Sequence, residues 1–153
     1  MEDELFKQME KDLALPIAMG KEMIAELGKE KALDIILKAY IRYQSARLQE
    51  GMEDIPPQKR DLQTFAKKVK QIVDSYQGNI ELLEASDEII RMKVNRCVPW
   101  EIFKKHGMPE MGLMFCECDF EATKAINPKM KLIRTKTLSA GDDQCNHTWV
   151  MEE

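Results

Sequence analysis

The spacing of apolar residues changes near Gly78, and this change limits the possible fold more than any other feature of the chain. Before it, apolar residues such as Leu5 and Met9 recur at intervals that place them on one side of a helix. After it come short segments rich in Ile, Leu, Val and Met, separated by turn residues, which is the pattern of β-strands. The sequence therefore predicts a helical part over residues 1–77 and a mixed part over residues 78–153.

Long helices are expected throughout the first part, over residues 2–27, 29–50 and 57–76. Pro16 lacks a backbone N–H group, so a kink or break is expected in the first helix near Leu15. The apolar face of the second helix is expected to consist of Ala32, Ile35, Ile36, Ala39, Tyr43, Ala46 and Leu48. The outer faces of these amphipathic helices are the surfaces that a homodimer would bury.

The second part is expected to contain short strands and helices in alternating pairs: strands 79–84 and 88–96, helices 99–106 and 109–126, and strands 130–138 and 144–151. Each pair of strands is predicted to form an antiparallel hairpin. The order of elements is then ααα-ββ-αα-ββ, which is typical of an α+β domain with one antiparallel sheet of about four strands. No repeat or long linker divides the chain, so a single domain over residues 1–153 is expected.

Charge and composition argue against two classes of partner. The net charge is −4 and the isoelectric point is about 5.4, which disfavours nucleic acid and anionic membrane surfaces. No apolar run approaches the roughly 20 residues that span a bilayer. The acidic start of the sequence lacks the features of a secretory signal, so a cytoplasmic protein with reduced thiols is expected.

All the cysteines and histidines lie in the last two-fifths of the chain, where thiolate or imidazole chemistry must therefore take place. On the last predicted helix, Cys116 and Asp119 share a face, whereas Cys118 points elsewhere and is expected to pack in the core. On the last predicted strand, Cys145 and His147 share a face because side chains alternate with a period of two.

Three interpretations of these residues stay open. In the first, Cys116 is a nucleophile that a neighbouring cation or base, such as Arg134 or His147, converts to a thiolate. In the second, a zinc ion is bound by Cys97, Cys116 or Cys118, Cys145 and His147. The irregular spacing and the lack of a Cys-x-x-Cys pair make this signal weak. In the third, the cysteines are buried and act as small hydrophobic side chains.

The C-terminal part also carries an ordered series of motifs: Cys97, Gly107-x-Pro109-Glu110, Cys116-x-x-Asp119, Asn127-Pro128 and Arg134-Thr135-Lys136-Thr137-Leu138-x-x-Gly141-x-x-x-Cys145. This series resembles the L-2-amino-thiazoline-4-carboxylic acid hydrolase family, whose members also resemble α+β small-molecule-binding domains of the 4-vinyl-reductase type. The resemblance implies hydrolysis of a cyclic amidine-like ring, on the route to L-cysteine through N-carbamoyl-L-cysteine. His147 departs from the pattern, because an aromatic residue is expected two places after the last cysteine.

The resemblance also implies roles for single residues. The predicted catalytic residues are Cys116, Asp119, Cys145 and Cys97. The predicted substrate-binding residues are Arg134, Thr137 and Gly141, together with His147, which is added although it departs from the family pattern. In this hypothesis Arg134 pairs with the substrate carboxylate, and a Cys116 thiolate or a water oriented by Asp119 attacks the ring carbon between nitrogen and sulfur, which opens a cyclic C–N bond.

No cofactor is expected for this reaction, and zinc on Cys97, Cys116, Cys145 and His147 is the alternative. The rival function is a non-enzymatic sensor domain that binds a small molecule or a metal. In either case the expected partner is a small molecule.

Overall fold

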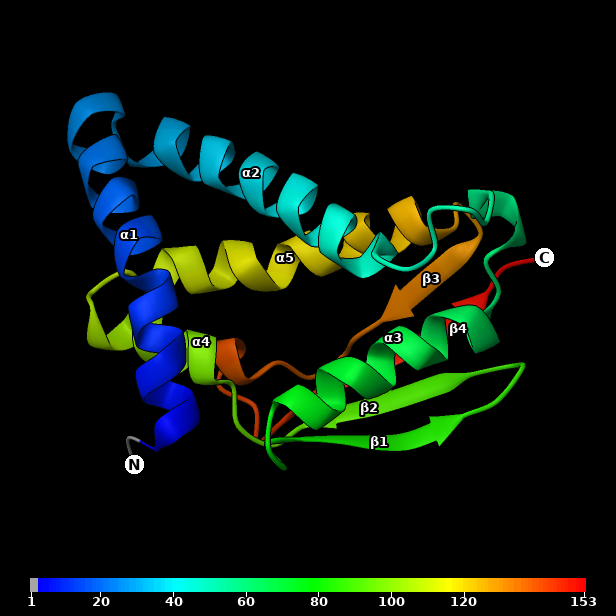
Figure 1. Cartoon of the computed structure of the whole chain (residues 1–153). Coiled ribbons are helices and arrows are strands. Elements are labelled where there is room, and N and C mark those ends of the chain that lie inside the picture. Colours follow the sequence, from blue (N-terminus) through cyan, green and yellow to red (C-terminus); the bar gives the residue numbers. More distant parts are fainter. Residues whose placement is uncertain (1–2) are drawn as a thin grey trace.

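The computed structural model describes residues 3–153. Three long helices come first, with a short 3-10 helix before the third: α1 (Glu4–Leu27), α2 (Lys29–Gln49), η1 (Pro57–Lys59) and α3 (Leu62–Ser75). The remaining elements are β1 (Ile80–Ala85), β2 (Ile90–Val94), α4 (Val98–Lys105), α5 (Pro109–Ile126), β3 (Met130–Ile133), η2 (Leu138–Ala140) and β4 (Cys145–Met151). The predicted α+β fold and its order of elements are confirmed (Figure 1).

The four strands form one antiparallel sheet in the order β1-β2-β4-β3, so β4 lies inside the sheet. In the register of β2 and β4, Val94 lies opposite Cys145 and Met92 lies opposite His147. These four residues are buried, while Lys93 and its neighbours on the other face are more exposed. One face of the sheet therefore belongs to the core, and β4 brings a thiol and an imidazole to that face.

The helices lie on the buried side of the sheet (Figure 1). Helix α3 packs on β1 and β4, α5 packs on β3, and α2 lies along α5. Helix α1 crosses α2 and α4 at one end of the molecule. None of the described helices is both long and apolar enough to cross a membrane.

Helix α1 runs without a break through Pro16, so the break that was one of the two expectations near Leu15 does not occur. Its start is capped by Asp3, whose carboxylate accepts the N–H group of Phe6 at 2.9 Å. Phe6 before the proline and Ile17 after it are both buried. Packing on both sides of Pro16 therefore keeps the helix continuous despite the missing backbone hydrogen bond.

The third helix begins later than predicted, at Leu62 rather than near Pro57. The carboxylate of Asp61 accepts the N–H group of Thr64 at 2.8 Å and so caps the start of α3. The segment before it is held apart from the helix by the buried guanidinium of Arg60, which donates to the carbonyl groups of the connecting loop. This internal network competes with the helical conformation.

The strand predicted over residues 130–138 ends at Ile133, so the second hairpin is shorter than expected. Beyond this point the side-chain oxygen of Asn146 accepts the N–H groups of Thr135 and Lys136, at 2.9 and 2.6 Å. These bonds replace most of the regular ladder between strands. The chain is thereby free to leave the sheet and to fold into the loop that contains η2.

The buried face of α2 is narrower than the predicted one. Ala32, Ile36 and Leu48 are buried, whereas Ile35 and Tyr43 are 38% and 61% exposed. The sequence pattern is ambiguous here because apolar residues occur on more than half of the helix circumference. Packing against α5 selects one side, and the other side remains at the surface.

Candidate functional site

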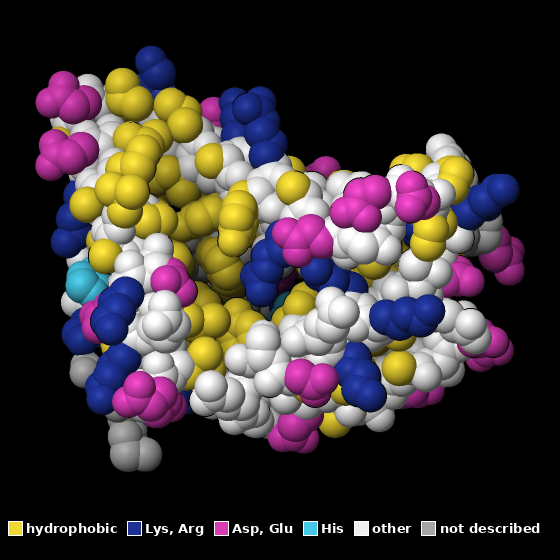
Figure 2. All heavy atoms as spheres, viewed as in Figure 1, with side chains coloured by type: hydrophobic (Ala, Val, Ile, Leu, Met, Phe, Trp, Pro, Cys, Tyr) yellow, Lys and Arg dark blue, Asp and Glu magenta, His cyan; other side chains and the backbone are white. Residues whose placement is uncertain are grey.

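A cavity of about 110 Å³ lies between α2, α3, α5 and the buried face of the sheet. An apolar cavity of roughly 150 Å³ binds benzene, so this smaller cavity has room for at most a single small ring. Figure 2 shows a hollow on one face of the molecule, with hydrophobic side chains inside it and Lys or Arg side chains beside it. The polar residues that line the cavity are Gln44, Arg47, Tyr76, Cys97, Cys116, Asp119, Thr123, Arg134, Cys145 and His147.

A largely buried ion pair joins α5 to the segment that follows β3. Arg134, whose side chain is 4% exposed, donates from Nη1 to Asp119 Oδ2 over 3.1 Å. Its Nη2 donates to the Cys116 carbonyl oxygen at 3.1 Å, and its guanidinium lies 4.8 Å from the centre of the Phe120 ring. His147 Nε2 lies 3.7 Å from the same Asp119 oxygen. Arg134 therefore holds the Asp119 carboxylate at the cavity wall and neutralises its charge.

Three thiols line the cavity in their neutral form. Burial raises the pKa of the Cys97 thiol to about 12. Burial also raises the pKa of Cys116, even though the Ser139 hydroxyl and the Arg134 charge act to lower it. The pKa of Cys145 is raised by burial in the same way. Because the thiolate is the reactive form of cysteine, these thiols are weak nucleophiles at neutral pH.

The loop between β3 and β4 covers two of these thiols. The Leu138 N–H group donates to Cys145 Sγ at 3.2 Å, and Ser139 Oγ lies 3.6 Å from Cys116 Sγ. Cys116 comes from α5 and Cys145 from β4, so the loop ties the helix layer to the sheet at the cavity. The thiols thus take part in the structure of the cavity wall.

Two predicted substrate-binding residues, Thr137 and Gly141, shape this loop and are not among the residues that line the cavity. The Thr137 N–H group donates to Asp142 Oδ2 at 2.7 Å, just before the turn of η2. Gly141 follows η2 with a φ angle of 98°, in the left-handed region that favours glycine. Their effect on the cavity passes through the loop that they hold in place.

Cys118 and His106 lie away from the cavity lining. Cys118 of α5 is buried, as the helical spacing predicted, and its Sγ donates to the Phe115 carbonyl oxygen at 3.1 Å. His106 ends α4, and its Nε2 lies 2.7 Å from Glu10 Oε1 of α1. His106 therefore joins α1 to α4.

Most of the predicted site residues do lie together around the cavity: Cys97, Cys116, Asp119, Arg134, Cys145 and His147. The sequence reasoning missed Gln44 and Arg47, which reach the cavity from α2. Gln44 lies in the buried stripe of that helix, midway between Tyr40 and Leu48. A polar residue within an otherwise apolar stripe was the signal that could have found it.

Within residues 3–153, no group of three or more His, Cys, Asp or Glu side chains is placed to hold a metal ion. The four residues that were considered as zinc ligands, Cys97, Cys116, Cys145 and His147, all line the cavity without forming such a group. The four cysteines are free thiols.

Fold and site together define a class of protein: an α+β domain in which helices close a small cavity against an antiparallel sheet. The family model described as L-2-amino-thiazoline-4-carboxylic acid hydrolase matches residues 7–149. The chain therefore belongs to the L-2-amino-thiazoline-4-carboxylic acid hydrolase family, and the predicted family is confirmed. No curated protein matches the chain.

A solved structure shares the fold, namely the phenol-responsive sensory domain of the transcription activator PoxR, which was crystallised with phenol. The two chains are 12% identical, and their comparison gives a TM-score of 0.50 over 90% of this chain and 73% of the sensory domain. At this identity the likeness concerns the fold alone. It agrees with the predicted relation to small-molecule-binding domains of the 4-vinyl-reductase type.

Proposed function

We propose that this protein binds a small carboxylated ring compound in the cavity and hydrolyses it, as the name of its family suggests. The observation that carries this proposal is the placement of Asp119 at the cavity wall, held by Arg134 and next to His147. A fixed carboxylate at the wall of a cavity is suited to orient a water molecule and to accept its proton. The reaction requires water and these side chains.

Of the two predicted attacking groups, the geometry favours water over the Cys116 thiolate. Burial raises the pKa of the Cys116 thiol, so little thiolate is present at neutral pH. Asp119 Oδ2 is engaged by Arg134, while Oδ1 forms no hydrogen bond with any described residue and is free to accept a water proton. Cys116, Cys145 and Cys97 then serve as neutral walls of the cavity.

The proposed reaction is the addition of one water molecule to the ring, followed by ring opening. The water oxygen attacks the ring carbon that is bonded to two nitrogens and to sulfur, and Asp119 takes one proton. To give N-carbamoyl-L-cysteine, that carbon must keep both nitrogens, so the ring C–S bond breaks rather than the C–N bond. One water hydrogen ends on the ring nitrogen and the other on the departing sulfur. The product therefore carries a new free thiol.

Release of this thiol from L-2-amino-thiazoline-4-carboxylate tests the function directly. The unsubstituted protein is expected to release thiol in many turnovers. Asp119→Asn is expected to lower the rate by roughly a hundredfold or more, because loss of a general base costs about 10²–10⁴ in rate. Cys116→Ala is expected to keep most of the activity. The reverse result, with Cys116 essential and Asp119 dispensable, would assign the attack to the thiol instead.

A second candidate is a binding domain without catalysis, which the neutral thiols and the fold shared with a sensory domain favour. In this function the same cavity holds a small ring compound and the protein reports its presence. Calorimetric binding of L-2-amino-thiazoline-4-carboxylate without any release of thiol would support it, and turnover would exclude it. The free cysteines suit the reducing cytoplasm in both cases.

A homodimer through the N-terminal helices is part of the proposal. Leu15 and Met19 of α1 are 68% and 56% exposed, and Tyr43 of α2 is 61% exposed. Apolar side chains of this size at the surface of adjacent helices are suited to an interface with a second copy. Sedimentation velocity is expected to show a dimer, which Leu15→Lys together with Met19→Lys would dissociate. A monomer at all accessible concentrations would contradict the dimer.

A further inference from the structure

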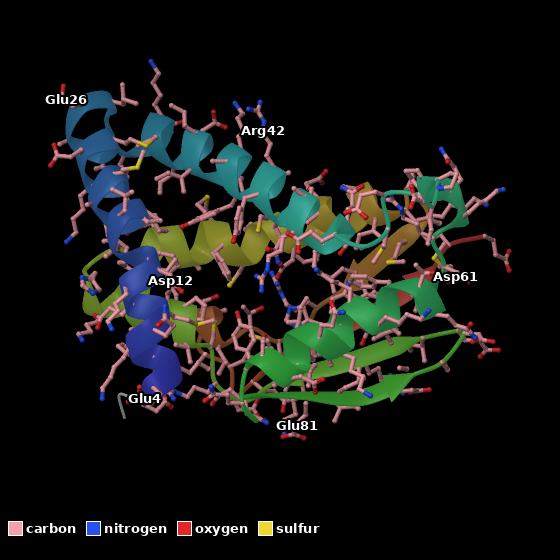
Figure 3. The ribbon with its side chains drawn as sticks, in the orientation of Figure 1. Glu4, Asp12, Glu26, Arg42, Asp61 and Glu81 are labelled. Atoms are coloured by element: carbon pink, nitrogen blue, oxygen red, sulfur yellow. The ribbon has the colours of Figure 1, made fainter. Side chains whose placement is uncertain are left out.

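Helix α2 brings two polar side chains to the cavity from the side opposite the sheet. Gln44 and Arg47 are three residues apart, so they lie on one face of the helix, and both line the cavity. Arg42 of the same helix points away from the sheet into solvent (Figure 3). The cavity therefore receives a guanidinium and an amide from α2 in addition to the groups on α5 and β4.

The charged residues around the cavity leave one positive charge without a counterion. These residues are Arg47, Asp119 and Arg134, and the last two form a pair with each other. No carboxylate or hydrogen-bond acceptor among the described residues engages the Arg47 side chain. Burial raises the pKa of the Tyr76 hydroxyl to about 12, and the Arg47 charge opposes this rise. The positive charge of Arg47 thus lies on the side of α2 that faces the cavity, where one bound anion would compensate it.

Two buried polar atoms of the cavity also lack partners. Within the described part of the chain, Gln44 Oε1 and His147 Nδ1 are buried and form no hydrogen bond. His147 is 7% exposed, and both residues line the cavity. A buried polar atom without a partner costs free energy, and native proteins usually satisfy such atoms with water or a ligand. Gln44 Oε1 is an acceptor, so it requires an N–H or O–H donor.

We propose that Arg47 binds the carboxylate of the ligand and that Gln44 accepts a hydrogen bond from an N–H group of its ring. The inference rests on the proposed function for the identity of the ring and deepens it by naming the residues that recognise it. It moves the carboxylate partner from Arg134, as expected from the sequence, to Arg47. Arg134 then remains a positioning residue for Asp119, because each of its two terminal nitrogens already donates to α5.

The ligand class follows from this assignment. A carboxylate at one end pairs with Arg47, and an amidine or amino N–H on the ring reaches Gln44. A neutral ring that lacks both groups, such as phenol, would leave the Arg47 charge unbalanced inside a cavity with apolar walls. The cavity is therefore selective for small amino-substituted heterocyclic acids.

Calorimetry with two aromatic probes that resist hydration tests the inference without requiring turnover. The probes are 2-aminothiazole-4-carboxylate and 2-aminothiazole-4-carboxamide, which differ in charge but share the amino group. The unsubstituted protein is expected to prefer the acid. Arg47→Gln is expected to weaken binding of the acid by roughly tenfold to a hundredfold, as for loss of a charged hydrogen bond, and to leave binding of the amide within about twofold. Gln44→Met is expected to weaken binding of both probes.

Arg42→Gln is the matched control, because it removes the same charge from the exposed side of the same helix. It is expected to change neither affinity. Arg47→Lys keeps the charge and is expected to retain the preference for the acid. If Arg47→Gln proves unstable, the lysine variant therefore shows whether the charge at this position is needed for binding of the acid. Three results would overturn the inference. These are equally tight binding of the acid by the Arg47→Gln variant, no preference for the acid in the unsubstituted protein, and no binding of either probe. Probe binding with no turnover of the thiazoline would contradict only the hydrolytic function.

Discussion

At the scale of single residues, the guanidinium of Arg134 has more partners than any other group at the cavity. It donates to Asp119 and to the Cys116 carbonyl oxygen, lies over the Phe120 ring, and is close to His147. A planar guanidinium can serve these partners together because its donors lie in a fixed fork. Its first role is therefore to keep a carboxylate in position inside a largely apolar wall.

Arg134→Gln is expected to lower the free energy of unfolding by about 1–3 kcal/mol. The loss is large because Asp119 and the Cys116 carbonyl oxygen would lose their donor while remaining partly buried. Arg91→Gln is the control, since Arg91 pairs with Glu84 at 2.8 Å on the exposed face of the sheet. That change is expected to cost less than about 0.5 kcal/mol. Urea unfolding measures the free energy of unfolding of the two variants. An equal decrease in both variants would contradict the structural role of Arg134.

At the scale of elements, the position of α5 decides whether the site exists, because this helix carries both Cys116 and Asp119. Small residues set its distance from its neighbours. A Cβ atom on Gly112 would lie 2.4 Å from the Trp100 ring of α4, and one on Gly20 of α1 would lie 2.5 Å from the Met111 sulfur. Close packing at these glycines thus brings three helices together around the start of α5.

Gly112→Ala is expected to destabilise the protein by about 1–2 kcal/mol, because a rigid indole ring must move and overpacking is costly. The loss exceeds the gain of up to about 1 kcal/mol that alanine brings to a helix. Gly20→Ala is expected to be close to neutral, since the atoms it meets belong to the flexible ends of methionine side chains. Thermal unfolding compares the two variants. A Gly112→Ala variant as stable as the original would show that α4 and α5 can separate without cost.

At the scale of the whole molecule, closing the cavity places several weak acids in an apolar interior. Burial raises the pKa of Cys97 and that of Tyr76 to about 12 each, and it also raises the pKa of Cys116 and Cys145. Below a pH of about 8.5 both the folded and the unfolded chain keep these thiol protons, so their contribution to stability is fully present. As the pH rises toward 12, the unfolded chain releases protons that the folded chain retains, and this contribution is lost.

The free energy of unfolding is therefore expected to fall on the alkaline side, by up to about 2–3 kcal/mol between about pH 7.5 and 10.5 for a thiol whose pKa is raised as far as that of Cys97. Urea unfolding at a series of pH values measures the slope. Cys97→Ala removes one of the contributing groups and is expected to flatten that slope, whatever its effect at neutral pH. A slope that is the same in both proteins would show that the Cys97 thiol titrates alike in the folded and unfolded chain.

The local elements could be predicted because each depends on neighbours in the sequence. The period of the apolar residues identified the helices and strands, and the spacing of Cys116 and Asp119 placed them on one face of α5. The predictions failed where distant contacts compete with local preference. Packing around Pro16 kept α1 continuous, and the Asn146 side chain ended the strand that was expected to run past Ile133.

The residues of the candidate site divide in the same way. The sequence alone determined the family, the order of elements and the thiols, acid and guanidinium of the C-terminal part, because these are properties of residue types and their spacing. Only the tertiary structure decided that Arg134 is already paired with Asp119 and that Gln44 and Arg47 face the same cavity. The physical reason is that α2 and α5 are far apart in the sequence but pack against each other in the fold. The residue pattern of one helix does not reveal which of its sides the other helix will cover.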